Sequence, residues 1–398
     1  MGRFGNRRFA ALSAAVAVAL LLPLACAGVA LGENASACEV STGAARTATG
    51  NTTAGAEPAA PVASEAEILS AFTLKLNEAF EAFQTMGAAV CIVQNGAVTD
   101  TFTYGALGRK GEPVTANTLF RVGSISKMVT AMGVMQLAEA GKISLDGDLS
   151  AALGFSVRNP AYPETSITLR QLLTHTAGLR DSNAYRNALN GKVTPLDELF
   201  SAKRARYQFL SNFEAGTKTE YSNFGGGLLG SVLEAVTGQT VDAYMQERVF
   251  APLRITAAYQ SALLPADAAV SDMYRMPSGR VAASVRDGQP AAVTADALTD
   301  YTLTAGKLTL SAPDLAKLVI VLCQRGRYGD TRILSEDTVA QMLTVQNGIG
   351  SVQCDSGRGL GLALVSDEGL NGRVLYGHGG KANGMLCAAY FDPTDGSG

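Results

Sequence analysis

The chain has 398 residues, of which 47% are hydrophobic and 17% charged, so it can bury a large core divided between two or three lobes. Its formal net charge is −3 at pH 7. Basic residues form no stripe and do not interleave with aromatic ones, and this pattern argues against a nucleic-acid partner.

The first 31 residues have the pattern of an export signal. Arg3, Arg7 and Arg8 precede an apolar run without acidic residues, and small residues near its end resemble a cleavage region. A run of roughly 20 apolar residues can also span a bilayer if it is not cleaved. We therefore expect residues 1–31 to be a signal peptide or a signal anchor. The mature protein would be extracellular or in the cell envelope, with a membrane tether as the alternative.

The next segment, residues 32–63, is rich in Ala, Thr, Gly and Ser, a composition typical of a disordered linker. Order begins at Ser64, where "SEAE" has the pattern of a capping box ahead of a helix. Two strands then meet at Asn95-Gly96, which is a strong hairpin signal.

Helical periodicity dominates the middle of the chain. The spacing of apolar residues predicts helices over 128–138, from 168 onward, over 230–238, over 240–250, and from 311 onward. Near the end, "RGLGLALV" and "RVLYGHGGKANGMLCAAYFD" read as successive strands. This order predicts an α+β fold over residues 64–398, with an antiparallel sheet flanked by helices and an inserted, mainly helical lobe at about 140–300.

Metal chemistry has no support in the sequence. The six cysteines include no CxxC pair and no Cys/His spacing typical of zinc, so we expect no metal or other cofactor. Of the two histidines, His175 ends a predicted helix, and we assign it to structure.

The stretch "FRVGSISK" places Ser124 at a helix start and Lys127 one turn later on the same face. A serine hydroxyl is a poor nucleophile until a base takes its proton, and a lysine amine can act as that base. Ser126 is a competing candidate, but it faces away from the lysine. The pair alone is a weak signal, because a serine at a helix start is usually only a cap.

Two further motifs follow in the chain. A Tyr-Ser-Asn motif begins at Tyr221, and a His-Gly-Gly motif begins at His378. In this order the three blocks resemble the penicillin-recognising serine hydrolases. The Tyr-x-Asn form is more similar to class C β-lactamases, D-Ala-D-Ala carboxypeptidases and their esterase relatives. The resemblance runs from about Ala66 to the end of the chain, and it implies a β-lactamase/transpeptidase-like fold.

The resemblance also implies catalytic roles. Ser124 would attack a carbonyl and become acylated, Lys127 would accept its proton, and Tyr221 would pass the proton to the leaving group. The backbone N–H groups of Ser124 and Lys381 would form the oxyanion hole.

Other positions would bind the substrate. Asn223 would contact both the substrate amide and Lys127, and Gly379 and Gly380 would let the strand approach closely. His378 and Gly379 stand where the family usually has a lysine and a Thr or Ser. A permanent cation and a hydroxyl are thus replaced, which weakens the expectation of carboxylate binding and of true β-lactamase activity.

The family usually adds a strand and a helix beyond the third motif, whereas this chain stops at "YFDPTDGSG". We therefore expect a truncated C-terminus with an exposed sheet edge. The sequence predicts no particular oligomeric state.

Together these patterns predict an exported serine hydrolase of the D-alanyl-D-alanine carboxypeptidase or esterase/amidase type. Its substrate would be a small molecule or a peptidoglycan stem peptide. A class C-type β-lactamase is one alternative, and a non-catalytic penicillin-binding or envelope protein of the same fold is another.

Overall fold

The computed structural model of the protein describes residues 64–108, 111–275, 280–283, 300–346, 357–366, 370, 372–382 and 384–398. The predicted signal segment and linker, residues 1–31 and 32–63, lie outside the described residues and stay predictions. None of the described helices combines the length and the apolar character that crossing a membrane would require.

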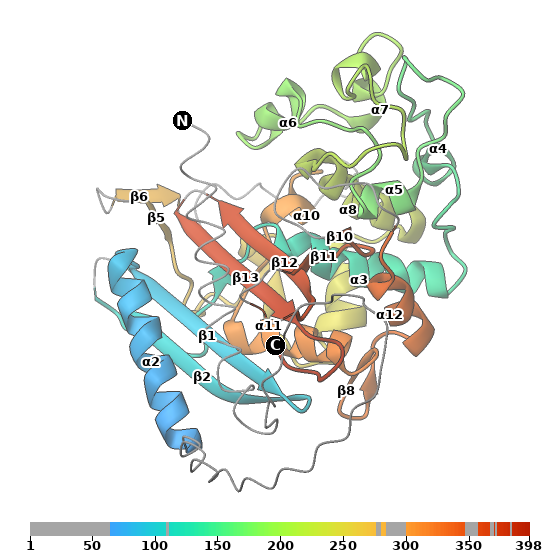
Figure 1. The fold of residues 1–398 in the computed structure, drawn as a ribbon. Coiled ribbons are helices and arrows are strands. Elements are labelled where there is room, and N and C mark those ends of the chain that lie inside the picture. Colours follow the sequence, from blue (N-terminus) through green and yellow to red (C-terminus); the bar gives the residue numbers. More distant parts are fainter. Residues whose placement is uncertain are drawn as a thin grey trace, which may run out of the picture.

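Helices make up most of the inserted lobe and cover the sheet (Figure 1). The α-helices are α2 (Glu65–Ala82), α3 (Ile125–Glu139), α4 (Leu149–Leu153), α5 (Leu169–Leu173), α6 (Asn183–Ala188), α7 (Leu196–Leu199), α8 (Asn223–Thr237), α9 (Val241–Met245), α10 (Leu303–Gly306), α11 (Ala312–Cys323) and α12 (Glu336–Leu343).

Strands lie mainly at the two ends of the described chain, and the paired strands are antiparallel. They are β1 (Gly87–Gln94), β2 (Ala97–Gly105), β3 (Phe120–Arg121), β4 (Ala257–Ala258), β5 (Met273–Arg275), β6 (Arg280–Ala283), β7 (Thr309–Leu310), β8 (Arg327–Tyr328), β9 (Thr331–Arg332), β10 (Gly357–Arg358), β11 (Ala363–Val365), β12 (Leu375–Ala382) and β13 (Met385–Phe391).

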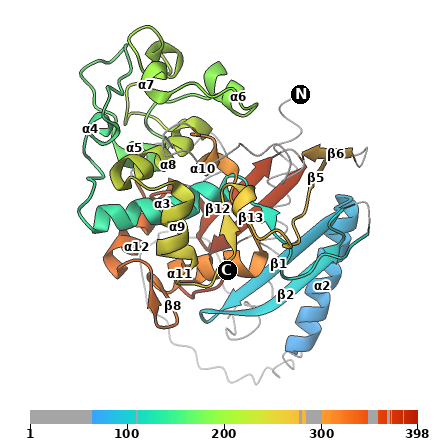
Figure 2. The same cartoon turned by 180° about the vertical axis from the view of Figure 1, so that it is seen from behind.

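The N-terminal unit is a helix packed on a hairpin. Ser64 and Glu67 form the predicted capping box of α2. Asn95 and Gly96 both have positive φ, 52° and 75°, and join β1 to β2 as the Asn-Gly signal predicts. Helix α2 packs on this hairpin from one side and α11 from the other (Figures 1 and 2).

Helix α3 runs through the centre of the molecule. Its residues from Ile125 to Val134 are all buried, so this part of the helix is covered on every face rather than on one side only. It packs against α8, α10 and β12, which brings its first turn beside the strand that carries the third motif.

Helix α8 begins at Asn223, seven residues before the predicted start at 230, so that prediction is wrong. The glycine-rich "NFGGG" turn has poor helix propensity. It is helical because Ser222 Oγ caps Gly225 N at 3.0 Å, and because the glycines allow very close packing. A Cβ on Gly227 would lie 1.6 Å from the carbonyl oxygen of Tyr301.

The C-terminal sheet has the order β10-β11-β12-β13. In the β12–β13 hairpin, His378 is opposite Ala389 and Gly380 is opposite Cys387. The terminal Gly398 exchanges two backbone hydrogen bonds with Val93 of β1, at 2.7 and 2.9 Å. The β-lactamase/transpeptidase-like α+β fold is therefore confirmed, with α4 to α9 forming the helical lobe away from the β1–β2 hairpin (Figure 2).

Candidate active site

Ser124 occupies the N-terminus of the central helix. It is the N-cap residue of α3, yet its side chain makes no capping hydrogen bond. The neighbouring Ser126 is fully buried; its Oγ donates to the carbonyl of Gly123 at 2.6 Å and accepts from Leu308 N at 3.0 Å. Ser126 is therefore a structural residue, and Ser124 carries the hydroxyl that faces the lysine.

Lys127 lies one helical turn behind Ser124, and the whole residue is only 2% exposed. Its Nζ is 3.0 Å from Ser124 Oγ, 2.9 Å from Asn223 Oδ1 and 2.5 Å from the carbonyl oxygen of Ala305. The stem of the lysine runs against Gly226 of α8, where a Cβ would stand 2.4 Å from Lys127 Cε. A glycine at 226 is thus what lets the buried lysine reach the serine.

Tyr221 brings a phenol to the same serine from a segment 97 residues further along the chain. Its hydroxyl donates to Ser124 Oγ at 2.8 Å. The ring lies among three other side chains. The His175 ring is 4.4 Å away, Lys127 Nζ is 5.0 Å from the ring centroid, and the Arg358 guanidinium is 5.6 Å from it. The phenol oxygen is therefore close to the serine while two cations lie near its ring.

Asn223 is held in a fixed orientation by both ends of its amide. Its Oδ1 accepts from Lys127, and its Nδ2 donates to Asp181 Oδ2 at 2.8 Å. The other carboxylate oxygen of Asp181 accepts from the backbone N–H of Phe224 at 3.0 Å, in the first turn of α8. Negative charge is favourable at a helix N-terminus, so Asp181 is stably placed to orient the amide.

His378 lies on β12 with its ring 6.3 Å from that of Tyr221. It is 5% exposed, and its Nδ1 donates to the carbonyl of Gly379 at 2.6 Å. Burial, reinforced by the positive charge of Lys127, lowers the pKa of His378 to about 3. The imidazole is therefore neutral near pH 7 and supplies no permanent cation at this position.

Strand β12 runs close to the start of α3. A Cβ on Gly380 would lie 2.1 Å from the carbonyl oxygen of Val122, so the strand could not approach this closely with a side chain there. A Cβ on Gly123 would lie 3.1 Å from Lys381 N. The backbone N–H of Lys381 thus lies beside the residue that precedes Ser124.

The three sequence motifs therefore meet around one hydroxyl. Sequence reasoning missed Asp181 and Arg358, because both lie in loops or strands whose local pattern carries no chemical signal.

The sequence analysis assigned His175 to a structural role. This buried residue has φ 58° and accepts a hydrogen bond from Ser222 N at 3.4 Å, while burial and the Arg358 charge hold its pKa well below 6.5. Within the described part of the chain, no group of three or more His, Cys, Asp and Glu side chains could hold a metal ion.

Comparisons with known proteins agree with this geometry. The sequence profile of the family described as Beta-lactamase matches residues 75–398. Penicillin-binding protein 4 of Amycolatopsis lactamdurans is 30% identical over 332 residues, which cover 81% of this chain and 82% of that protein. Lovastatin esterase of Penicillium rubens is 33% identical over 175 residues, which cover 38% of this chain and 41% of that protein.

Among solved structures, the octameric penicillin-binding protein homologue from Pyrococcus abyssi superposes with a TM-score of 0.65 at 24% identity. The superposed residues cover 84% of this chain and 72% of the Pyrococcus abyssi chain. At this identity the likeness supports the fold alone. The fold and the cluster around Ser124 define a serine hydrolase. With a profile that matches most of its length, the chain belongs to the β-lactamase family.

Proposed function

We propose that this enzyme works through an acyl-enzyme on Ser124. The observation that carries the proposal is that Ser124 Oγ lies within hydrogen-bond distance of two proton-transfer groups, Lys127 Nζ at 3.0 Å and the Tyr221 hydroxyl at 2.8 Å. A nucleophile and its base within about 2.6–3.2 Å is the arrangement that activates a serine.

In the first step Lys127 accepts the serine proton. Asn223 Oδ1 and the Ala305 carbonyl oxygen can only accept hydrogen bonds, so they take two of the N–H groups of the amine. The third position on Nζ faces Ser124 Oγ, and it is there that the amine exchanges a proton with the serine. After proton transfer the ammonium donates to the same three oxygens, so the amine can change protonation state without moving.

In the second step Tyr221 gives a proton to the leaving group and later helps a water molecule attack the acyl-enzyme. Charge that develops on the phenol oxygen is stabilised by Lys127 and by Arg358 near the ring. The oxyanion that forms on the substrate would accept from the backbone N–H groups of Ser124 and Lys381. Removing one such donor typically raises the barrier by about 2.7–4 kcal/mol.

The substrates we propose are small esters or amides, or peptides that end in D-Ala-D-Ala. The neutral, buried His378 favours esters and amides, because it offers no permanent charge for a substrate carboxylate beside Ser124. Similarity to a penicillin-binding protein over most of the chain supports the carboxypeptidase reaction. Asn223 would bind the substrate amide through the N–H that Asp181 does not use.

We also propose that the enzyme is exported, on the basis of the charged and apolar pattern of residues 1–31. Cell fractionation of the full chain tests this part separately. Recovery in the cytosol only would contradict it.

A substrate panel tests the reaction class. We expect hydrolysis of p-nitrophenyl esters or release of D-Ala from a D-Ala-D-Ala peptide, and slow or no turnover of a chromogenic cephalosporin. Ser124→Ala should abolish the activity, whereas Ser126→Ala should keep it at reduced stability. Rapid cephalosporin turnover would favour the β-lactamase alternative. A folded protein with no turnover and no acylation would favour the non-catalytic one.

A further inference from the structure

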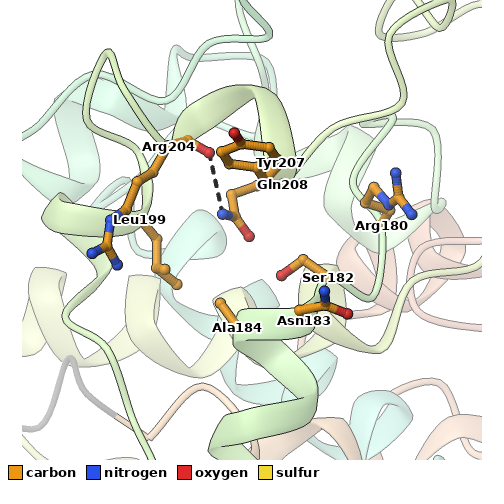
Figure 3. A pocket seen from close by; sticks show the side chains of 8 residues that line it. All are labelled: Arg180, Ser182, Asn183, Ala184, Leu199, Arg204, Tyr207 and Gln208. Carbon is orange, nitrogen blue, oxygen red and sulfur yellow. Dashed lines mark hydrogen bonds between the residues drawn. The ribbon is translucent and has the colours of Figure 1, made fainter.

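A cavity lies in the helical lobe, and none of its lining residues belongs to the cluster around Ser124 described above. Its volume is about 400 Å³, within the usual range for small-ligand sites. Figure 3 shows Ser182 and Ala184 at the start of α6, Leu199 at the end of α7, and Tyr207 and Gln208 on the segment opposite. The cavity is thus a half-open site lined by several separate turns of the lobe rather than by one loop.

The side-chain carbonyl of Gln208 is directed into this cavity (Figure 3). Gln208 is 2% exposed; its Nε2 donates to the carbonyl of Arg204 at 3.3 Å, while its Oε1 accepts no hydrogen bond from any residue that the structure describes. A buried acceptor left without a donor costs about 1–3 kcal/mol. A ligand with an N–H group at this point would remove that cost.

The charge on the cavity wall is positive. The eight lining residues include two arginines and no acidic side chain. Arg204 pairs with Glu198 at 2.9 Å, but within the described part of the chain Arg180 has no ion-pair partner. Its neighbour Asp181 directs its carboxylate to Asn223 and Phe224 instead. The exposed guanidinium of Arg180 is therefore the charge that can meet an anion.

We propose that this cavity binds a carboxylate with a neighbouring amide N–H, as in an N-acylated amino acid or the end of a peptide. The ligand N–H donates to Gln208 Oε1, and the ligand carboxylate pairs with Arg180. The apolar part of the ligand packs against Ala184 and Leu199. The carboxylate belongs either to a part of the substrate remote from the bond that is cleaved at Ser124, or to a separate acid.

The position of the cavity links it to catalysis. Asp181 stands between two lining residues, Arg180 and Ser182, and it holds the Asn223 amide that in turn accepts from Lys127. The cavity wall is thus directly adjacent in sequence to the first member of the hydrogen-bond chain that orients the catalytic amine.

Calorimetry on protein whose Ser124 is blocked by a fluorophosphonate tests the cavity alone. The probe is N-acetyl-D-alanine, and N-acetyl-D-alanine amide is its neutral match. We expect the acid to bind and the amide to bind at least tenfold more weakly. Arg180→Gln should weaken binding of the acid about tenfold or more, and Gln208→Met should weaken both probes. Lys203→Gln removes the same charge from an exposed residue that does not line the cavity, and it should leave binding unchanged.

No binding to blocked protein, equal binding of acid and amide, or an equal loss in Lys203→Gln would overturn the proposal. Intact-mass spectrometry shows separately whether the fluorophosphonate has reacted with Ser124. If it does not react, that result refutes the hydrolase mechanism but not the proposed ligand of the cavity. In that case binding is measured on Ser124→Ala.

Kinetics with paired esters then identifies the source of the carboxylate. If it belongs to the substrate, Arg180→Gln lowers kcat/KM for an ester with a distal carboxylate but not for its neutral analogue. If the carboxylate belongs to a separate acid, Arg180→Gln changes kcat/KM equally for the charged and the neutral ester. Added N-acetyl-D-alanine then changes the turnover of both esters by the wild type but not by Arg180→Gln.

Discussion

Replacing Gly226 by alanine should disable the enzyme without touching a reacting group. The new Cβ would lie 2.4 Å from Cε and 2.7 Å from Cδ of Lys127, whereas carbon atoms normally pack at about 3.5–4.0 Å. The lysine must therefore retreat by about 1 Å. It cannot do so freely, because it is 2% exposed and its Nζ is held by three oxygens.

The expected effect on rate is larger than the effect on stability. A misplacement of about 1 Å in a catalytic group can lower the rate about 100-fold. Overpacking typically costs about 1–3 kcal/mol, but alanine gains about 1 kcal/mol over glycine inside a helix. We therefore expect a loss of about 0–2 kcal/mol in the free energy of unfolding, so the variant stays folded.

The adjacent glycine gives a matched control. A Cβ on Gly225 would meet its nearest atom at 3.6 Å, an ordinary contact with Ser222. Gly225→Ala should keep kcat/KM for ester hydrolysis within about threefold and gain up to about 1 kcal/mol in urea unfolding. If Gly226→Ala is as active as Gly225→Ala, then the buried lysine does not depend on this contact and the reasoning is refuted.

Three further predictions concern residues around the serine. Asp181→Asn should lower kcat about tenfold or more with little change in the amount of folded protein, because Asn223 loses its fixed orientation; an unchanged kcat would count against this role. Arg358→Gln should lower kcat more than it raises KM, because negative charge that develops on Tyr221 in the transition state loses one nearby cation; a loss of folded protein with kcat unchanged would instead indicate a packing role. Between pH 7.5 and 5.0, the free energy of unfolding of wild type should fall by about 2 kcal/mol more than that of His378→Gln. In the unfolded chain His378 binds a proton below about pH 6.5. In the folded protein the pKa of His378 is about 3, so the side chain stays unprotonated at pH 5.0 and acid favours the unfolded state. Urea unfolding at the two pH values checks this, and parallel losses would show that His378 is not buried in the neutral form.

Local patterns were enough to predict the elements that carry the nucleophile. The spacing of Ser124 and Lys127 by one helical turn fixes their contact whatever the rest of the chain does, and the structure has Nζ 3.0 Å from Oγ. The Asn95-Gly96 turn and the Ser64 cap are likewise determined by a few neighbouring residues.

Contacts between distant segments could not be read in the same way. Asp181 reaches Asn223 across 42 residues, and nothing in its loop distinguishes it from other acidic loop residues. The meeting of Tyr221 and His378 with the serine was expected only from resemblance to a family. The early start of α8 was missed because glycine propensity argues against a helix, while the packing that favours one comes from residues near 301.

The most direct test of this account is the site of acylation. The protein is treated with a fluorophosphonate or a fluorescent penicillin, and the adduct is mapped by intact-mass and peptide mass spectrometry. The account predicts one adduct, on the peptide that contains Ser124, which is lost in Ser124→Ala and formed much more slowly in Gly226→Ala. An adduct that persists in Ser124→Ala, or that maps to another residue, would contradict it.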